Sequence, residues 1–430
     1  MPTEPFRSLP GQIVEDLRAR ITAGTLSPGD PLPATRVLAR QRGISRGSVV
    51  AAYEQLTGEG YLVATRGGTR VNPDLPRPPR PELPAAAAGA AAPPRLRGDL
   101  RPGVPDTAVL ASTLWRQAWR AAAAEPAGHP GQGSPRLRRL LAEHLRTTRS
   151  VAVSPEQLVV TLGARDGLRL ILMATEGVVA VEDPGYPTLH RVPRNLGREV
   201  VRVPVDEEGL SVRRLAELAP EVVLVMPNHQ YPAGSQMSAA RRFELIEWAR
   251  RSGAVLVEDD YDSELRHTHP ALAALDPHGS VAMLGSFAKT LTPALGLGYL
   301  VVPERLRAEV LAHALPVSGI VQDAMANFLE NDGVRRHTAR MGREYRRRRE
   351  IFAEVFPRGI PMNGGLHAVI ELDGDEDGAV ERCRAQGLAV EGLGSYWTAS
   401  DRAGIVIGLG AHKREKLREV LVDLRRVLAT

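Results

Sequence analysis

The apolar residues near the N-terminus recur at helical spacing. Ile13, Leu17 and Ile21 lie four residues apart, so they share one face of a helix. Ser8 precedes this stretch and can cap the helix, and Gly24 follows it as a stop signal. The pattern predicts a first short amphipathic helix.

Two more short helices and a hairpin follow. One helix is expected over about 35–42, and Gly43 ends it. Ser45 can cap the next helix, expected over about 45–57, and a tight turn separates the two. Residues 61–72 then alternate between apolar and polar side chains around two adjacent glycines, the pattern of a hairpin or wing. Together these elements predict a winged helix-turn-helix.

The body of the chain repeats a short apolar run, a turn and an amphipathic helix, of which 238–252 is an example. The runs are apolar on both faces, which is typical of strands in a sheet that helices cover on both sides. The runs are 158–162, 178–182, 222–226, 254–258, 281–284 and 298–302. They predict an α/β domain with a parallel or mixed sheet.

The last hundred residues have a different pattern. A long arginine-rich helix is expected over about 320–352, and strands are expected near 366–372 and 405–409. A final amphipathic helix is expected over 412–428. This order of elements predicts a smaller α+β lobe.

A stretch rich in proline and alanine, 73–98, has too few large apolar side chains to build a core, which predicts a semi-rigid linker. We therefore expect a winged-helix domain over 1–72 and a body over 99–430. Within the body, the large part is expected over about 99–315 and the small lobe over about 316–430.

Composition narrows the class of protein. The 430 residues are 43% hydrophobic and 24% charged, with no apolar run approaching twenty residues, so we expect no membrane span. The chain has no pattern of a secretory signal, and its single cysteine, Cys383, cannot form an internal disulfide. The cytoplasm is the expected compartment. The net charge of +5 suits a polyanionic partner but is weak support, because arginine dominates the basic residues throughout.

One lysine lies among residues suited to a cofactor. Lys289 follows an apolar run, and a primary amine forms Schiff bases that a guanidinium cannot. Segments at the carboxyl ends of the predicted strands should meet at one edge of the sheet. There, the glycine turn at 163–165 opens a helix that suits a phosphate, and 258–262 supplies carboxylates and a phenol. The set predicts a site for pyridoxal 5′-phosphate (PLP).

Several acidic, histidine and arginine residues also have simpler interpretations. Taken alone, Asp259, Asp260 and Asp262 suit either a solvated loop or a divalent cation. The lysine string favours the cofactor, and we predict no metal site. We interpret His229 as a hydrogen-bonding neighbour of the site rather than a proton carrier. The basic run 345–349 is interpreted as a solvated helix face rather than a nucleic-acid surface.

The motifs, in this order, resemble those of MocR-type regulators, in which a GntR-like winged helix is joined to a fold-type I aminotransferase-like domain. The resemblance covers nearly the whole chain. In the head, 17–63 resembles the GntR pattern. Two strings in the small lobe, "GLGSYW" (392–397) and "GIVIGLG" (404–410), resemble the PdxR-type subgroup. The hallmark strings of the body are "HQYPAG" (229–234), "EDDYDSE" (258–264) and "SFAKTL" (286–291).

The resemblance implies roles for individual residues at the PLP site. Lys289 would form the internal aldimine, and Tyr186 would stack on the ring. Asp259 would pair with the pyridine nitrogen; it is preferred over its acidic neighbours because it lies two residues before Tyr261, which would contact the ring hydroxyl. The phosphate would be surrounded by Gly163, Ala164, Arg165 and Ser286.

The resemblance also implies a homodimer that binds operator DNA through the winged helix, with base edges read from the helix at about 45–57. Neither the operator sequence nor the choice between activation and repression follows from it. The residues expected to face DNA are Arg36, Arg46, Ser48, Arg66, Thr69 and Arg70.

Three departures from the aminotransferase pattern bear on function. Gly296 stands where many relatives have an arginine for the phosphate, and Tyr231 stands where an asparagine usually precedes the "PTG" motif. No arginine lies in the strand that should clamp a substrate carboxylate, and Arg402 is the nearest candidate for an effector carboxylate. These departures argue against efficient transamination, although residual aminotransferase-type chemistry stays open.

A site that binds the coenzyme but binds amino acids only weakly is the kind expected of a regulator that senses PLP and controls vitamin B6 synthesis. Three alternatives stay open at this point. They are a PLP-dependent aminotransferase with a DNA-binding head, a regulator that senses an amino acid or amine on the coenzyme, and a DNA-binding protein whose body holds no cofactor.

Overall fold

The chain divides into two compact units, Met1–Pro93 and Pro94–Thr430. The computed structural model describes residues 9–75, 96–265, 270–362, 365–398 and 402–429. The predicted cap Ser8 and most of the predicted linker lie outside the described residues.

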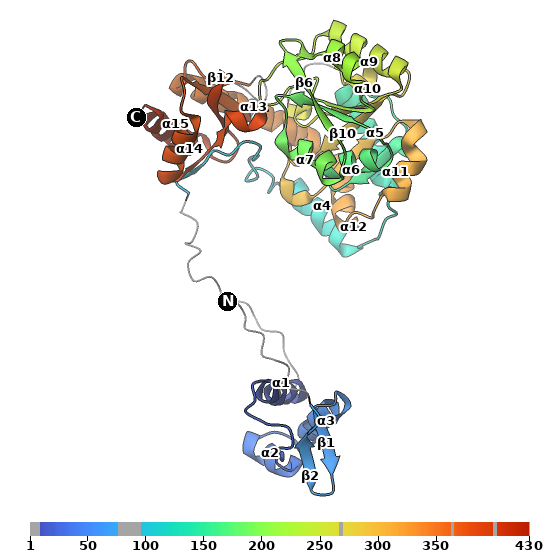
Figure 1. The fold of residues 1–430 in the computed structure, drawn as a ribbon, viewed down its shortest axis with the longest axis vertical. Coiled ribbons are helices and arrows are strands. Elements are labelled where there is room, and N and C mark those ends of the chain that lie inside the picture. The colour runs from blue at the N-terminus through green and yellow to red at the C-terminus, as the bar shows by residue number, and fades with distance from the viewer. Residues whose placement is uncertain (1–8, 76–95, 266–269, 363–364, 399–401, 430) are drawn as a thin grey trace. The chain divides into compact units, whose positions relative to one another are not determined.

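The first unit has the predicted winged helix-turn-helix (Figure 1). Gly43 ends the second helix in the left-handed conformation, with φ of 65°, and the Ser45 side chain accepts a hydrogen bond from the Ser48 N–H at the start of the third. Val49 and Leu56 lie fully buried in one cluster with the hairpin residue Val71. The elements are α1 (Leu9–Thr22), α2 (Thr35–Arg42), α3 (Arg46–Gly58), β1 (Leu62–Thr65) and β2 (Gly68–Val71).

The second unit is built around an eight-stranded sheet with the order β4-β11-β10-β9-β8-β5-β6-β7. Six strands run parallel, and β11 and β7 run antiparallel to their neighbours. All six predicted strands are present; β6 and β7 were not predicted, because β6 lies near the edge and has polar residues among its apolar ones. The strands are β4 (Leu158–Thr161), β5 (Val179–Asp183), β6 (Val200–Asp206), β7 (Gly209–Leu210), β8 (Val222–Val225), β9 (Val255–Asp259), β10 (Val281–Ser286) and β11 (Gly298–Val301).

Helices cover both faces of this sheet. Successive residues of β10 point to opposite sides: Ala282 and Leu284 pack with the cluster that includes α6 and α7, whereas Met283 packs with the cluster that includes α5 and α12. This alternation explains why the strands are apolar at every position. The helices are α4 (Thr113–Ala124), α5 (Pro135–Arg149), α6 (Ala164–Met173), α7 (Pro187–Asn195), α8 (Val212–Leu218), α9 (Ala239–Ser252), α10 (Leu272–Leu275), α11 (Arg307–His313) and α12 (Gly319–Glu330).

The single long helix predicted over about 320–352 is wrong. The structure has two helices there, α12 and α13 (Gly333–Val355). Asp332 interrupts them with a φ of 61°, in the left-handed region. A Cβ at Gly333 would lie 2.2 Å from the Phe328 ring, so the turn needs a glycine at this position. The Asn-Asp-Gly sequence at 331–333 is a turn signal that the helical periodicity concealed.

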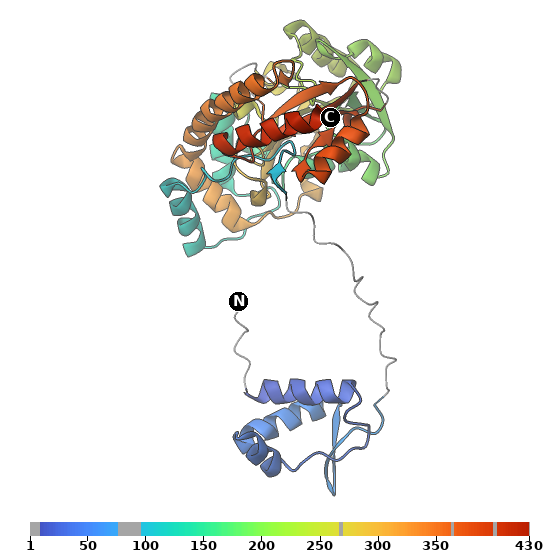
Figure 2. The same cartoon turned by 90° about the vertical axis from the view of Figure 1, so that its left-hand side faces the viewer.

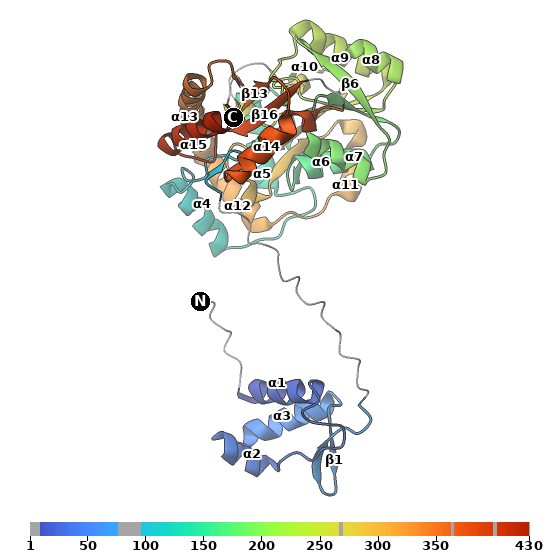
Figure 3. The same cartoon turned by 60° about the vertical axis from the view of Figure 1, so that its left-hand side comes forward.

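The small lobe has a four-stranded antiparallel sheet with the order β12-β13-β16-β15, covered by α13, α14 and α15. The helices α13 and α15 pack side by side (Figures 2 and 3). Phe352, Cys383 and Leu421 meet in its buried core. The elements are β12 (Ile360–Pro361), β13 (His367–Leu372), α14 (Glu376–Ala385), β15 (Glu391–Gly392), β16 (Ala403–Gly408) and α15 (Arg414–Leu428).

Residues 97–106, here called the connecting segment, carry the chain from the linker into the body. Their short strand β3 (Gly98–Asp99) pairs in parallel with β14 (Leu388–Ala389) of the small lobe. The segment then crosses the end of β16, where the Gly408 N–H donates a 2.6 Å hydrogen bond to the Leu100 oxygen. The described residues that follow the predicted linker are therefore held directly on the small lobe.

Candidate functional site

The carboxyl ends of four parallel strands converge at one edge of the large sheet. The strand β4 leads to Gly163, β5 leads to Tyr186, and β9 ends at Asp259. The strand β10 ends at Ser286, three residues before Lys289. Since neighbouring parallel strands deliver their turns to the same edge, segments far apart in sequence form one site.

All eight residues predicted to hold a cofactor line one cavity of about 190 Å³. A second cavity of about 440 Å³, the outer chamber, shares with it Lys289, Asp259, Tyr261, Tyr186 and Thr188. The eight are Lys289, Asp259, Tyr261, Tyr186, Gly163, Ala164, Arg165 and Ser286. Their individual roles stay predictions, but the structure brings the whole set together.

The half-buried amine of Lys289 contacts the connecting segment. Its Nζ donates a 2.9 Å hydrogen bond to the Gly103 oxygen and lies 5.9 Å from the centre of the Tyr186 ring. Gly103 has a φ of 80°, and a Cβ there would lie 2.2 Å from the Lys289 Nζ. Sequence reasoning missed Gly103; its only signal was a glycine next to Pro102, which is typical of a tight turn.

The three consecutive acidic residues at the end of β9 point in different directions. Glu258 accepts hydrogen bonds from the Leu272 and Ala273 N–H groups, and Asp260 pairs with Arg149 through contacts of 2.6 and 2.9 Å. Only Asp259 of the three lines the two cavities. Of the three acidic residues, the geometry therefore favours Asp259, the one chosen from the sequence, as the partner of the pyridine nitrogen.

Asp259 is an unusual carboxylic acid. Burial raises the pKa of Asp259 from 3.8 to about 7, and the nearby carboxylates of Asp260 and Asp262 add to the increase. The ammonium of Lys289 acts in the opposite direction. A further cation placed beside such a buried carboxyl group stabilises its ionised form.

His229 orients the phenol of Tyr261. The His229 Nδ1 lies 2.9 Å from the Tyr261 Oη and 2.7 Å from the Asp262 Oδ2, and the two rings stack with an angle of 15° between their planes. His229 is 2% exposed. These contacts agree with the hydrogen-bonding role predicted for it.

The other end of the smaller cavity is suited to an anion. The helix α6 begins after Gly163, which has a φ of 119° and no side chain with which to cap the first N–H groups. A glycine there leaves these groups and the positive end of the helix dipole for a ligand. Ser286 and Gly296 also line this cavity, and Arg165 is its only cation besides Lys289 among the described lining residues.

Aromatic and acidic side chains surround the outer chamber. The buried Tyr231 ring lies 4.4 Å from His367 and 5.2 Å from Tyr396, whose hydroxyl donates to Glu391. Burial lowers the pKa of His367 to about 3, so this imidazole is neutral at physiological pH. Arg191, an exposed residue, is the only guanidinium among the described residues that line the chamber. Sequence reasoning singled out neither Glu391 nor Arg191.

Arg402 is not brought to the site. Its guanidinium pairs with Glu371 and lies 5.6 Å from the Trp397 ring, and about half of its side chain is exposed. It lines neither cavity. A residue that lies just before β16 and is paired on the surface is poorly placed for the carboxylate role that we predicted for Arg402.

The residues predicted to face DNA lie on the helix-turn-helix and the wing. Arg46 opens α3, and the Ser48 hydroxyl lies 2.8 Å from the capping Ser45 hydroxyl. On the wing, Arg70 donates a 3.0 Å hydrogen bond to the Gly29 oxygen. Arg36, Arg46, Arg66 and Arg70 are exposed, and Ser48 and Thr69 are half-buried.

Two further findings concern only the part of the chain that the structure describes. It contains no group of three or more histidine, cysteine, aspartate or glutamate side chains arranged to hold a metal ion. No helix within it combines the length and the hydrophobicity that crossing a bilayer demands.

Both units of the chain match known protein families. Residues 9–71 match the family of bacterial regulatory proteins of the gntR family, and residues 117–390 match aminotransferase class I and II. The chain is 45% identical, over 442 residues, to the HTH-type pyridoxine biosynthesis transcriptional regulator PdxR of Corynebacterium glutamicum, covering 98% of this chain and 96% of that one. It is 32% identical to the probable rhizopine catabolism regulatory protein MocR of Rhizobium meliloti, covering 96% and 92%.

Solved structures support the fold of the second unit. An archaeal alanine:glyoxylate aminotransferase matches 78% of this chain and 91% of its own, with a TM-score of 0.71 and 21% identity. The multiple substrate aminotransferase of Thermococcus profundus matches 77% and 91%, with a TM-score of 0.69 and 22% identity. At this identity the likeness concerns the fold alone, and it confirms the fold-type I architecture predicted from the sequence.

Proposed function

Because the chain belongs to the MocR-type transcriptional regulators, which join a GntR-family winged helix to an aminotransferase-like domain, we propose that it senses PLP at Lys289 and controls vitamin B6 synthesis. The name of the relative that is 45% identical, a pyridoxine biosynthesis regulator, supports this choice of pathway. The observation that carries the proposal is the cavity of about 190 Å³ that all eight predicted cofactor residues line.

The residues of this cavity fit the coenzyme one chemical group at a time. Lys289 offers the primary amine for the aldehyde carbon, and Asp259 offers a buried carboxyl for the pyridine nitrogen. Tyr261 offers a phenol, already oriented by His229, for the ring hydroxyl. The start of α6 and Ser286 offer N–H and hydroxyl donors for the phosphate. When bound, the coenzyme supplies an electron-withdrawing ring joined covalently to the lysine.

The outer chamber supports a sensor over an efficient aminotransferase. Among its described lining residues the only guanidinium, Arg191, is exposed, and Glu391 adds a negative charge. Arg402 is paired with Glu371 outside the chamber. Among these described residues no buried arginine is placed to bind the carboxylate of an amino acid, which supports sensing over efficient transamination.

The connecting segment provides a route from the site toward the linker. The Lys289 amine is hydrogen-bonded to Gly103, and the same segment continues through β3 into the linker. Any change in the bonding of that amine alters the hydrogen bond that holds Gly103. We propose that a homodimer uses this change to alter operator affinity, with a coupling free energy of about 1–3 kcal/mol.

Operator binding in the presence and absence of PLP tests this function. A duplex selected for binding from random DNA is titrated with the coenzyme-free protein, then with protein saturated by PLP, and then with PLP plus single amino acids. A change of about fivefold or more in affinity with PLP alone supports coenzyme sensing. If affinity changes only when an amino acid accompanies PLP, the effector is the amino acid and the proposal is rejected.

A further inference from the structure

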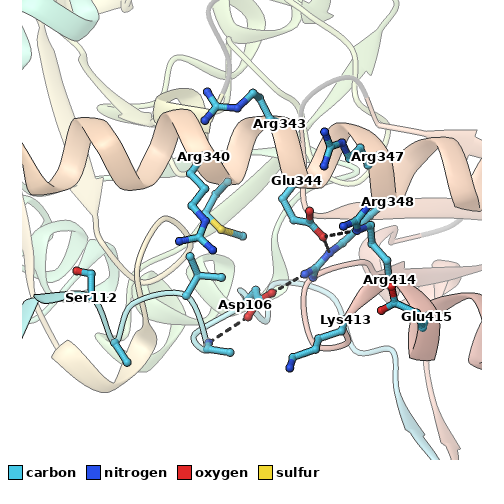
Figure 4. A pocket seen from close by; sticks show the side chains of 14 residues that line it. Asp106, Ser112, Arg340, Arg343, Glu344, Arg347, Arg348, Lys413, Arg414 and Glu415 are labelled. Carbon is cyan, nitrogen blue, oxygen red and sulfur yellow. Dashed lines mark hydrogen bonds and ion pairs between the residues drawn. The ribbon is translucent and has the colours of Figure 1, made fainter.

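A cavity of about 620 Å³ lies outside the coenzyme site, between α13, the loop at 106–112 and the start of α15 (Figure 4). This cavity, here called the arginine pocket, shares no lining residue with the two cavities around Lys289. Its volume is typical of sites for small molecules.

The arginine pocket is strongly positive. Its lining includes six cationic side chains and three carboxylates, a net charge of +3. The cations are Arg340, Arg343, Arg347, Arg348, Lys413 and Arg414, and the acids are Asp106, Glu344 and Glu415. Such an excess favours an anion.

A buried arginine pairs with two of the three acids. Arg348 is 1% exposed and pairs with both Asp106 and Glu344. It also donates to the oxygens of Leu409 and Gly410, at 3.2 and 2.9 Å. This network fixes the inner wall of the pocket. Most of the other cationic side chains that line the pocket have no carboxylate partner within it.

Four of the remaining cations are available to a ligand. Within the described part of the chain, Arg340, Arg343, Arg347 and Lys413 have no ion-pair or hydrogen-bond partner. Arg340 points from α13 toward the loop at 106–112, and Lys413 projects toward the same loop from the start of α15 (Figure 4). The two side chains therefore border one space from opposite elements.

Two helix N-termini reinforce this charge. Ser112 caps α4 and lines the pocket, and the first residues of α15, Arg414 and Glu415, line it as well. The N-cap residue of α15, Lys413, makes no side-chain capping hydrogen bond. The start of α15, which has no side-chain cap, and the positive ends of both helix dipoles favour an anion, and here they accompany unpaired cations at the same cavity.

We propose that the arginine pocket binds an organic phosphate with two or more negative charges, such as a nucleoside diphosphate, as a second ligand of this regulator. Arginine matches phosphate oxygens with paired donors, which favours phosphate over a single carboxylate. The loop of the pocket begins at Asp106, three residues after Gly103. A ligand bound there contacts the same stretch of chain that Lys289 holds.

Isothermal titration of the full chain with ADP and with inorganic pyrophosphate tests this proposal. The double variant Arg340→Gln/Lys413→Gln removes one cation from each side of the pocket. The matched double variant Arg336→Gln/Arg346→Gln removes the same charge from exposed positions of α13 that do not line it. We expect the first variant to weaken binding by about tenfold or more and the second to leave it nearly unchanged.

A third variant separates the two anion sites of the body. Arg165→Gln alters the coenzyme cavity and should leave binding of both probes intact. Tighter binding of ADP than of pyrophosphate would identify a nucleotide as the ligand, and equal binding would identify the phosphate group alone. The inference is overturned if neither probe binds at millimolar concentration, if both double variants lose equal affinity, or if only Arg165→Gln abolishes binding.

Discussion

The amine of Lys289 is hydrogen-bonded, at 2.9 Å, to the backbone oxygen of Gly103, a residue that precedes it by 186 positions. The contact joins the lysine predicted to bind PLP to the connecting segment, which follows the predicted linker. The φ of 80° at Gly103 favours a glycine, and a side chain there would also displace the Lys289 amine.

Substitution of Gly103 tests the importance of this contact. In Gly103→Ala the new Cβ would lie 2.2 Å from the Lys289 Nζ, so the amine must move. We expect PLP affinity, followed by visible absorbance, to fall about tenfold. Gly197→Ala is the control, because Gly197 also has a positive φ, 71°, but has no atom within 4 Å of the added Cβ. Equal affinity in the two variants would show that the contact has no role in coenzyme binding.

Two neighbouring aspartates should affect stability in opposite directions. The folded protein holds a proton on Asp259, whose pKa is raised from 3.8 to about 7, whereas the unfolded chain releases it above about pH 4. The stability due to this group therefore falls as pH rises through this window. We expect coenzyme-free Asp259→Asn to be more stable than the natural sequence at pH 8, by about 1–3 kcal/mol, and to lose this advantage toward pH 4.

Asp260→Asn provides the contrast. The substitution removes the carboxylate that pairs with Arg149, a buried residue that is 4% exposed. We expect a loss of about 3 kcal/mol at pH 8, measured by the shift in thermal unfolding. A gain in stability for Asp260→Asn, or a loss for Asp259→Asn at this pH, would contradict the different environments assigned to the two residues.

Arg46 at the start of α3 should contact DNA. We expect Arg46→Ala to weaken operator binding about tenfold in a gel-shift titration, and the salt dependence to decrease by about one released counterion if the contact is to phosphate. Arg20→Ala, on the exposed end of α1, is the matched control. Equal losses in the two variants would assign the effect to general charge rather than to the helix-turn-helix.

Local patterns were sufficient for most of the fold. The strands that are apolar on both faces and the capped helices of the head were predicted because their sequence signals lie within a few residues of each other. The strand β6 was missed because its residues are only partly buried, and the break at Asp332 was missed because helical periodicity continues across it.

The residues of the site were only partly predictable from the sequence. The residues at the strand ends could be collected because parallel strands deliver their turns to one edge. Gly103 and Glu391 come from distant segments, and no local pattern indicates that they approach Lys289 and the outer chamber. Arg402 was chosen by its place near a strand, but its pairing with Glu371 depends on the cross-strand register, which the sequence alone does not reveal.

The covalent attachment of the coenzyme at Lys289 is the central claim, and peptide mass spectrometry tests it most directly. The protein is saturated with PLP, reduced with borohydride to make the carbon–nitrogen bond permanent, and digested. The chain has only two other lysines, Lys413 and Lys416, which serve as internal controls. We predict modification of Lys289 alone, and none in Lys289→Ala; an unmodified Lys289, or equal modification of all three lysines, would contradict the account.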